Sequence, residues 1–240
     1  MAIREARFCA APYRGAVVET LPLFPLGTVL LPGASLPLHI FEPRYRQLTV
    51  DLVTGAVPSR RFGVVAIRQG YQIGDAPVLH DIGCTALLRE ARRLPDGRFD
   101  IVTRGERRFR LVDVDATSAP YLVGTVEFVP DHDPHEEQRA LLPQLAAAAR
   151  AAHRYYCKTA WRSEDWHEPS SDVTPQTLSH LLASDCLLTL EDRQNLLEET
   201  CPADRLRLVR RMLCREAQFL RKLRAVPVPL SQFATDTSHN

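Results

Sequence analysis

The segment LPLFPLGTVLLPGASLPLHIFEPRY, from Leu21 to Tyr45, decides the fold of this chain. No charged side chain lies between Glu19 and Glu42, so most of the segment must be buried. Its length would suit a membrane-spanning helix. However, four prolines between Leu21 and Leu38 each remove a backbone donor and clash with a continuous helix. The segment is therefore predicted to lie inside a globular fold rather than in a bilayer.

The same segment is predicted to form two short buried strands, Val17 to Leu26 and Ser35 to Phe41. Proline is tolerated at strand starts and edges, and the Leu31-Pro32-Gly33 sequence is typical of a turn between two strands. A helix from Pro43 to Thr54 follows, because proline at the first helical position loses only a donor that has no partner there. Its apolar side is predicted to hold Tyr45, Leu48, Leu52 and Val53.

A second pattern lies between Ile82 and Phe109. An apolar strand runs into Pro95-Asp96-Gly97, whose residue types favour a tight turn, and a second strand leads on to Arg104-Gly105-Glu106-Arg107-Arg108-Phe109. These strands are predicted to form a hairpin. The continuous apolar run from Phe62 to Ile67 predicts a central strand covered on both faces, and Tyr121 to Val129 predicts a last strand.

The two patterns together resemble the Lon protease amino-terminal (substrate-binding) domain, a module that also occurs in cereblon and in short stand-alone bacterial proteins. The resemblance extends from Val17 to Arg224, and the chain is identified as a stand-alone bacterial member of that family. It implies an α+β fold, in which a PUA-like twisted β pseudo-barrel subdomain is followed by an α-helical bundle subdomain.

A change to polar residues from Pro130 to Glu137 marks the predicted boundary between these subdomains. The β-rich part is expected at 17–130 and the helical part at 131–224, with a flexible tail at 1–16 and a disordered tail at 225–240. A long helix is predicted from Gln138 to Trp161. The last helix, which begins after Thr200, is predicted to be amphipathic because apolar residues recur at helical spacing along it.

The composition is that of an ordinary globular protein. A formal net charge of +1 gives no overall reason to expect binding to nucleic acid or to an anionic membrane. Of 30 basic residues only Lys158 and Lys222 are lysine. This excess of arginine suits phosphate or carboxylate binding. A bias in nucleotide composition is the preferred explanation, because arginine excess without a motif is only a compositional signal.

The six cysteines form no Cys-x-x-Cys pair and are expected to be reduced and buried. Residues 1–16 contain Arg4, Glu5, Arg7 and Arg14 without a long apolar core, so no signal peptide is expected and the chain is predicted to be cytoplasmic.

No catalytic or cofactor motif is present in the sequence. A full Lon enzyme adds an ATPase module and a Ser-Lys peptidase module, but the chain has no Gly-x-x-x-x-Gly-Lys-Ser/Thr loop and no Gly-x-Ser-x-Gly elbow. Both lysines lie on predicted helices among charged neighbours. We therefore expect neither an enzyme nor a cofactor.

Two groups of residues could supply metal ligands. The run from His132 to Glu137 lacks the fixed spacing of a zinc site and is better explained as a solvated linker. His153 and Cys157 share a helix face, but a buried cysteine beside a histidine explains them more simply than a metal that needs two further ligands. No metal site is predicted. His39 is expected to be packed or hydrogen-bonded.

Candidate binding residues lie at two places. Phe41, Glu42, Arg44 and Tyr45 stand where a buried strand passes into a helix, a junction that often exposes side chains at a cleft. The alternative is that Glu42 and Arg44 cap and brace the helix while Tyr45 lies in the core.

The second place is the arginine run around Gly105. Strand alternation puts Arg108 and Arg110 on one face, where they could meet an acidic or phosphorylated partner. A solvated strand edge protected by charge is the alternative explanation for these arginines.

The family resemblance implies a non-enzymatic polypeptide-binding or adaptor module. Its expected partners are unfolded or tagged polypeptides and a separate protease, bound through exposed apolar side chains and unpaired strand edges. RNA binding is the alternative, because PUA-like barrels also occur in RNA-modifying proteins. The near-neutral charge argues against nucleic acid. No membrane partner is expected, and the sequence specifies no oligomeric state.

Overall fold

The computed structural model describes residues 18–69, 78–161 and 166–223. Contacts divide the chain into two compact units, and the boundary along the sequence lies between Asp131 and His132. We call the first the β unit and the second the helical unit. The described strands all lie in the first unit together with one helix, and the second unit is helical, so the predicted α+β class is confirmed. The predictions of tails at 1–16 and 225–240 lie outside the described residues.

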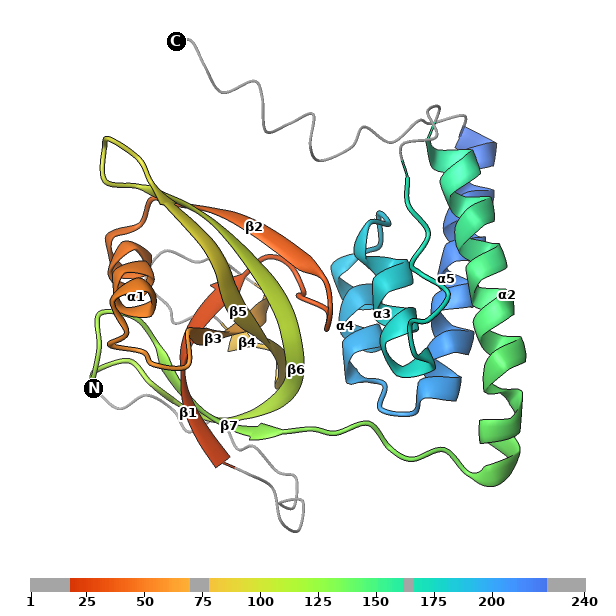
Figure 1. Ribbon diagram of the computed structural model, residues 1–240, viewed down its shortest axis with the longest axis horizontal. Helices are drawn as coiled ribbons and strands as arrows, with labels where there is room; N and C mark the ends of the chain where they lie inside the picture. The colour runs from red at the N-terminus through yellow and green to blue at the C-terminus, as the bar shows by residue number, and fades with distance from the viewer. Residues whose placement is uncertain (1–17, 70–77, 162–165, 224–240) are drawn as a thin grey trace. The chain divides into compact units, whose positions relative to one another are not determined.

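The β unit is a sheet that closes on itself (Figure 1). Along the chain its elements are β1 (Val18–Leu26), β2 (Ser35–Ile40), α1 (Pro43–Thr54), β3 (Arg61–Gln69), β4 (Val78–Leu79), β5 (Ile82–Arg93), β6 (Phe99–Asp115) and β7 (Val123–Phe128). β1 pairs antiparallel with β7 and parallel with β3, which closes the ring β1–β7–β6–β5–β3. β2 pairs with the first half of β6. The short strand β4 was not predicted from the sequence.

The two sequence patterns that predicted the fold contact each other in the structure. Gly33, in the turn after β1, adopts a left-handed conformation with φ of 83°. Its amide donates a hydrogen bond to the carbonyl of Gly105 at 2.8 Å, and the Gly105 amide donates to the carbonyl of Ala34 at 2.9 Å. The proline-rich segment is therefore fixed directly onto β6.

Phe109 stands at the centre of the β unit core and is completely buried. It packs with aliphatic side chains from β1, β3, β6 and β7. A Cβ atom at Gly63 or Gly83 would lie 2.8 or 2.5 Å from the Phe109 ring. These two glycines therefore give the ring the space it occupies, which explains the glycine at the start of β5.

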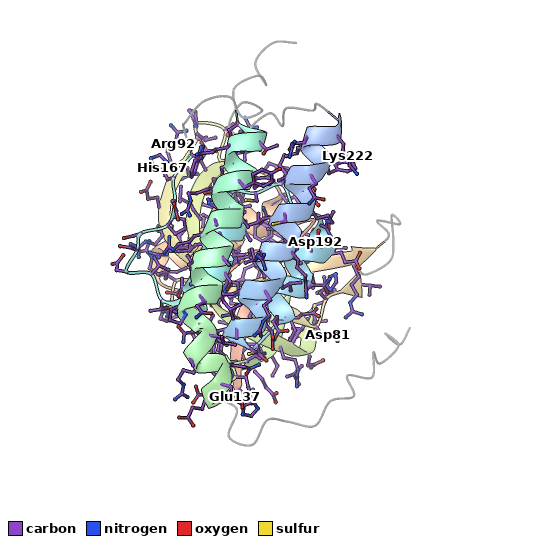
Figure 2. The ribbon with its side chains drawn as sticks, turned by 90° about the vertical axis from the view of Figure 1, so that its right-hand side faces the viewer. Asp81, Arg92, Glu137, His167, Asp192 and Lys222 are labelled. Atoms are coloured by element: carbon purple, nitrogen blue, oxygen red, sulfur yellow. The ribbon has the colours of Figure 1, made fainter. Side chains whose placement is uncertain are left out.

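The helical unit contains α2 (Glu136–Ala160), α3 (Pro175–Ser184), α4 (Leu190–Glu198) and α5 (Pro202–Leu223). α2 and α5 lie side by side and run in the same direction (Figures 1 and 2). The Sγ of Cys201 lies 3.8 Å from Gln138 Oε1 near their starts, and Arg221 Nη1 donates to the Tyr155 hydroxyl at 2.8 Å near their ends. The predicted apolar face of α5 is confirmed, because its residues Leu206, Val209, Leu213 and Ala217 are buried.

Arg205 is the largest fully buried side chain of the protein's described residues. Its guanidinium donates to Ser179 Oγ at 2.8 Å, to the carbonyl of Gln176 at 2.7 Å and to the carbonyl of Glu199 at 2.9 Å. One side chain thus joins α3, the turn before α5 and α5 itself. A buried guanidinium requires such a full set of acceptors.

Candidate functional site

The junction between β2 and α1 exposes part of the predicted binding group. The Phe41 side chain is 61% exposed. Glu42 forms no side-chain cap on α1, and its carboxylate instead pairs with Arg44, whose Nη2 lies 2.8 Å from Oε2. Tyr45 is buried and stacks on Phe24 with ring centroids 3.9 Å apart. The junction therefore presents Phe41, Glu42 and Arg44, while Tyr45 belongs to the core.

The outer side of α1 carries further exposed apolar side chains. Val50 is 37% and Val53 is 54% exposed, so the prediction that Val53 faces the core is wrong. Both follow Pro43 at intervals that place them on one side of the helix. We call Phe41, Val50 and Val53 the α1 apolar surface. Apolar side chains grouped at an element junction are a common feature of protein-binding surfaces.

A pocket of about 300 Å³ adjoins this surface. α1 and the β5–β6 hairpin supply the lining residues, which are Pro43, Arg46, Gln47, Val50, Arg93, Gly97 and Phe99. The Nη2 of Arg46 extends over the hairpin turn, 2.6 Å from the position that a Cβ atom would occupy on Gly97. Gly97 takes a left-handed φ of 81°, as expected for the predicted Pro-Asp-Gly turn. We call this pocket the α1–hairpin pocket.

The sequence prediction missed Arg46 and Arg93. Arg46 follows Pro43 and precedes Val50 at helical spacing, which placed it on the outer side of α1. Arg93 is the last residue of β5, directly before the hairpin loop. Only the folding of the hairpin beside α1 brings them to one pocket, so helical periodicity could have identified Arg46 but not its neighbour.

A hydrogen bond at the opposite end of α1 holds the helix to the strand region before β7. The Tyr121 hydroxyl donates to Asp51 Oδ2 at 2.8 Å, and Gln47 Nε2 donates to Asp51 Oδ1 at 2.7 Å. Burial of the phenol, followed by the bond to Asp51, raises the pKa of Tyr121 to about 12. Asp51 therefore connects the helix that carries the pocket to the rest of the β unit.

We expect Tyr121→Phe to lower the free energy of unfolding of the β unit by about 1.5–2 kcal/mol, because it removes a hydrogen bond to a charged acceptor. The Tyr121 pKa is raised in the folded state, so its contribution is complete below about pH 10, the ordinary tyrosine pKa. The contribution is lost as the pH rises toward about 12. Urea unfolding followed through NMR methyl signals of Leu21 and Leu23 in β1 and Val126 in β7 measures both effects. A difference between the two proteins that does not shrink above pH 10 would contradict this linkage.

Arg108 is buried, with 5% exposure, although Arg110 remains partly exposed. The Arg108 guanidinium pairs with the Asp131 carboxylate and donates to the carbonyl of Val129 at 3.3 Å. β6 pairs with β5 at both arginines and with β7 from Phe109 onward, so the alternative of a solvated strand edge is wrong. Arg108 holds the segment after β7, and we leave it out of the surface proposed below. Arg110 stays a prediction.

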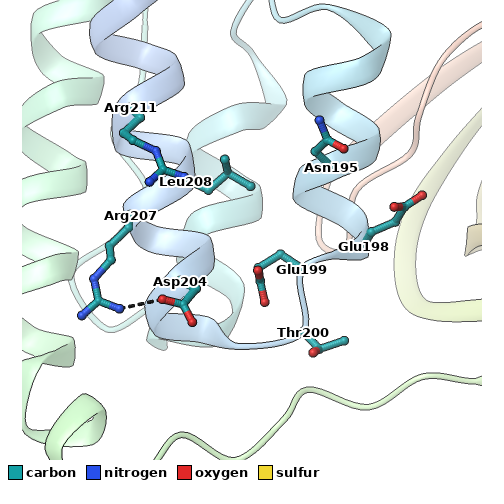
Figure 3. Close-up of a pocket in the computed structure, with 8 residues that line it drawn as sticks. All are labelled: Asn195, Glu198, Glu199, Thr200, Asp204, Arg207, Leu208 and Arg211. Atoms are coloured by element: carbon teal, nitrogen blue, oxygen red, sulfur yellow. Dashed lines mark hydrogen bonds and ion pairs between the residues drawn. The ribbon is translucent and has the colours of Figure 1, made fainter.

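A second pocket, of about 530 Å³, lies between α4 and α5 in the helical unit (Figure 3). It is lined by Asn195, Glu198, Glu199, Thr200, Asp204, Arg207, Leu208 and Arg211. Its carboxylates have partners within the unit: Asp204 accepts from Arg207 at 2.7 Å, and Glu199 accepts from the Cys201 amide at 2.8 Å. Charges of both signs line this pocket, which gives it no clear preference for either kind of ion.

The two predictions about histidine hold in the structure. His39 Nδ1 lies 2.8 Å from Asp100 Oδ1, so this histidine is hydrogen-bonded. His153 and Cys157 are both buried, with Nε2 and Sγ 3.5 Å apart. The neighbouring Cys186 thiol, followed by the contact with His153, lowers the pKa of Cys157. Within the described ranges no group of three or more potential ligands could hold a metal ion.

Comparison with known proteins gives the family. Residues 20–215 match the ATP-dependent protease La (LON) substrate-binding domain. The chain belongs to the Lon substrate-binding domain family. The Lon protease 2 of Myxococcus xanthus is 29% identical over 210 residues, which are 85% of this chain and 24% of that protein. The Lon protease 1 of Herpetosiphon aurantiacus is 26% identical over 208 residues, 85% of this chain and 25% of that protein. The chain thus spans about a quarter of these relatives.

Solved structures of Lon amino-terminal domains share the fold. The Lon N-terminal domain protein from Xanthomonas campestris is 26% identical and superposes with a TM-score of 0.55, covering 87% of this chain and 99% of that one. The N-terminal domain of the Mycobacterium avium complex Lon protease has a TM-score of 0.58 at 20% identity, over 81% of this chain and 98% of that one. The predicted Lon-like fold is therefore confirmed. Among the described residues no helix is both long and apolar enough to span a bilayer.

Proposed function

We propose that this member of the Lon substrate-binding domain family is a non-catalytic, cytoplasmic module that binds unfolded or tagged polypeptides and presents them to a separate protease. The family match over residues 20–215 supports substrate recognition as its general role. The α1 apolar surface carries the finer proposal, because Phe41 presents a large aromatic side chain at 61% exposure two residues before Pro43, which lines the α1–hairpin pocket. Aromatic side chains, phenylalanine included, are enriched at the centres of protein interfaces.

The chemistry of this surface suits a polypeptide without fixed structure. Phe41, Val50 and Val53 offer apolar contact, while the paired Glu42 and Arg44 keep the rim polar. An unfolded chain exposes apolar side chains that a folded protein buries, so it has most to gain from such a surface. Selection between folded and unfolded forms then needs no recognition of sequence.

Replacing Phe41 and Val53 together with serine should weaken binding of a permanently unfolded protein such as casein by about tenfold or more. The reason is that fully burying one such apolar side chain contributes about 1.5–3 kcal/mol, and about 1.4 kcal/mol corresponds to a tenfold change in affinity. Fluorescence anisotropy of labelled casein measures the dissociation constant directly.

Val112→Ser provides the matched control, because Val112 is a 38% exposed apolar residue on β6 outside this surface. It should bind casein as the unchanged chain does. Equal affinity of the unchanged chain, the double serine variant and the Val112 variant for casein would refute the proposed surface. Tighter binding of a folded protein of similar size than of casein would refute it as well. The same samples incubated with ATP should leave both casein and ATP intact, and turnover of either would contradict the non-catalytic role.

A further inference from the structure

We infer that the α1–hairpin pocket binds a carboxylate of the polypeptide, with the guanidinium groups of Arg46 and Arg93 as its counter-charges. The inference rests on the proposed polypeptide-binding function and specifies the chemistry that this function selects. Two sources of the group fit the pocket equally: the free carboxyl end of a chain, or the side chain of an internal aspartate or glutamate.

The lining of the pocket is positive and otherwise neutral. Arg46 and Arg93 are its only charged lining residues, and its other walls are the apolar Pro43, Val50 and Phe99 with Gln47 and Gly97. Arginine on an apolar wall is suited to a carboxylate, because its planar fork can donate two parallel hydrogen bonds.

The carboxylates near the pocket are already engaged elsewhere. Asp96 on the hairpin turn pairs with Arg98 at 2.5 Å. Asp100 pairs with Arg92 at 2.6 Å and with His39 at 2.8 Å. These acidic side chains therefore neutralise other cations around the pocket.

Among the described residues, the side chains of Arg46 and Arg93 form no hydrogen bond or ion pair with another residue. In the part of the chain that the structure describes, these two guanidinium groups therefore form no ion pair with a carboxylate of the protein. The Arg46 group is nevertheless placed, since it extends across Gly97 of the hairpin turn. A placed but unneutralised pair of guanidinium groups is the arrangement that an incoming anion completes.

The size of the pocket limits what enters it. A volume of about 300 Å³ lies at the lower end of the range for ligand sites, so it admits a side chain or a chain end. Val50 belongs both to the pocket lining and to the α1 apolar surface, and Phe41 lies two residues before Pro43. A polypeptide with its carboxylate in the pocket can therefore place neighbouring apolar residues on Phe41 and Val50.

The test uses four labelled ten-residue peptides with one common apolar core and the full-length chain. The first has a free carboxyl end and no acidic side chain, and the second is the same peptide with an amidated end. The third is amidated with one internal glutamate, and the fourth is amidated with glutamine in that place. We expect the carboxylate-bearing peptide of at least one pair to bind about tenfold tighter than its neutral partner, and the pair identifies the source.

Variants locate the effect. Arg46→Gln combined with Arg93→Gln should remove the preference for the carboxylate while keeping the residual affinity for the neutral peptides. Arg46→Lys should retain part of it, since lysine keeps the charge but not the two-pronged geometry. Arg89→Gln, an exposed arginine on the same strand as Arg93, should leave it unchanged. Circular dichroism establishes that each variant is folded.

Each other outcome overturns the inference. Equal binding of all four peptides would exclude a carboxylate site but leave polypeptide binding standing, because casein binding through Phe41 is measured separately. A preference that survives in the double arginine variant would place the site elsewhere. Displacement of the peptides by an equal concentration of single-stranded RNA would assign the two arginines to phosphate. Failure of every peptide to bind would exclude the pocket as a peptide site.

Discussion

Arg205→Ala should lower the free energy of unfolding of the helical unit by about 3–5 kcal/mol. The substitution leaves the buried acceptors on Ser179, Gln176 and Glu199 without this donor, and each buried group that loses its partner costs about 1–3 kcal/mol. It also opens a cavity where the largest fully buried side chain lay. A loss of this size is a large fraction of the stability of an ordinary domain.

The two tryptophans make this measurement specific to one unit. Trp161 and Trp166 are the only tryptophans of the chain, and both belong to the helical unit. Urea unfolding followed by tryptophan fluorescence therefore reports on that unit alone. Arg205→Met separates the two causes, because it keeps most of the volume and loses only the hydrogen bonds.

Arg210→Ala is the control for these experiments. Arg210 is an exposed arginine on the same helix, so its removal should change the free energy of unfolding by less than about 0.5 kcal/mol. If the Arg205→Ala and Arg210→Ala variants had the same free energy of unfolding, the buried guanidinium would contribute nothing to the stability of the helical unit.

Gly105→Ala should destabilise the β unit by about 3 kcal/mol. A Cβ atom at this position would overlap the carbonyl oxygen of Leu31 and approach the Leu30 side chain to 3.1 Å. Backbone cannot rotate aside as a side chain can, so the turn must separate from β6. The hydrogen bonds that join Gly105 to Gly33 and Ala34 are then weakened as well.

Hydrogen exchange of the β6 amides measures this effect, since their protection depends on the stability of the ring. Gly27→Ala serves as the comparison, because a Cβ atom at Gly27 meets nothing within 4 Å and should change stability by less than about 0.5 kcal/mol. Equal protection of β6 in the two variants would show that the turn tolerates a side chain at Gly105.

The elements of the fold could be predicted from the sequence because local chemistry specifies them. Proline spacing excluded a membrane helix, and the prediction of a helix from Pro43 to Thr54 matches α1 at both ends. α2 begins two residues before the predicted Gln138 and ends one residue before Trp161, since helix ends depend on the residues around them. Strand positions followed in the same way from apolar runs between turn residues.

The candidate site was harder to predict because it depends on contacts between distant segments. Helical periodicity placed Tyr45 on the apolar side of α1, but its stacking partner, Phe24 of β1, could not be predicted from the sequence. Arg108 is covered because the chain after β7 returns to place Asp131 beside it. Arg93 reaches α1 only through the hairpin. A charged residue is buried when another segment of the chain packs over it. The sequence pattern of one strand cannot predict which segment that will be.

The closure of the ring by β1 has a consequence for how the chain acquires its fold during synthesis. β1 must be joined on one side to β3 and on the other to β7, whose last residue, Phe128, is more than a hundred positions further along. Contacts of such long sequence separation slow folding. We therefore expect the nascent β1 to remain unprotected until the ribosome has released β7, whereas a helix such as α5 can form as soon as its own residues emerge.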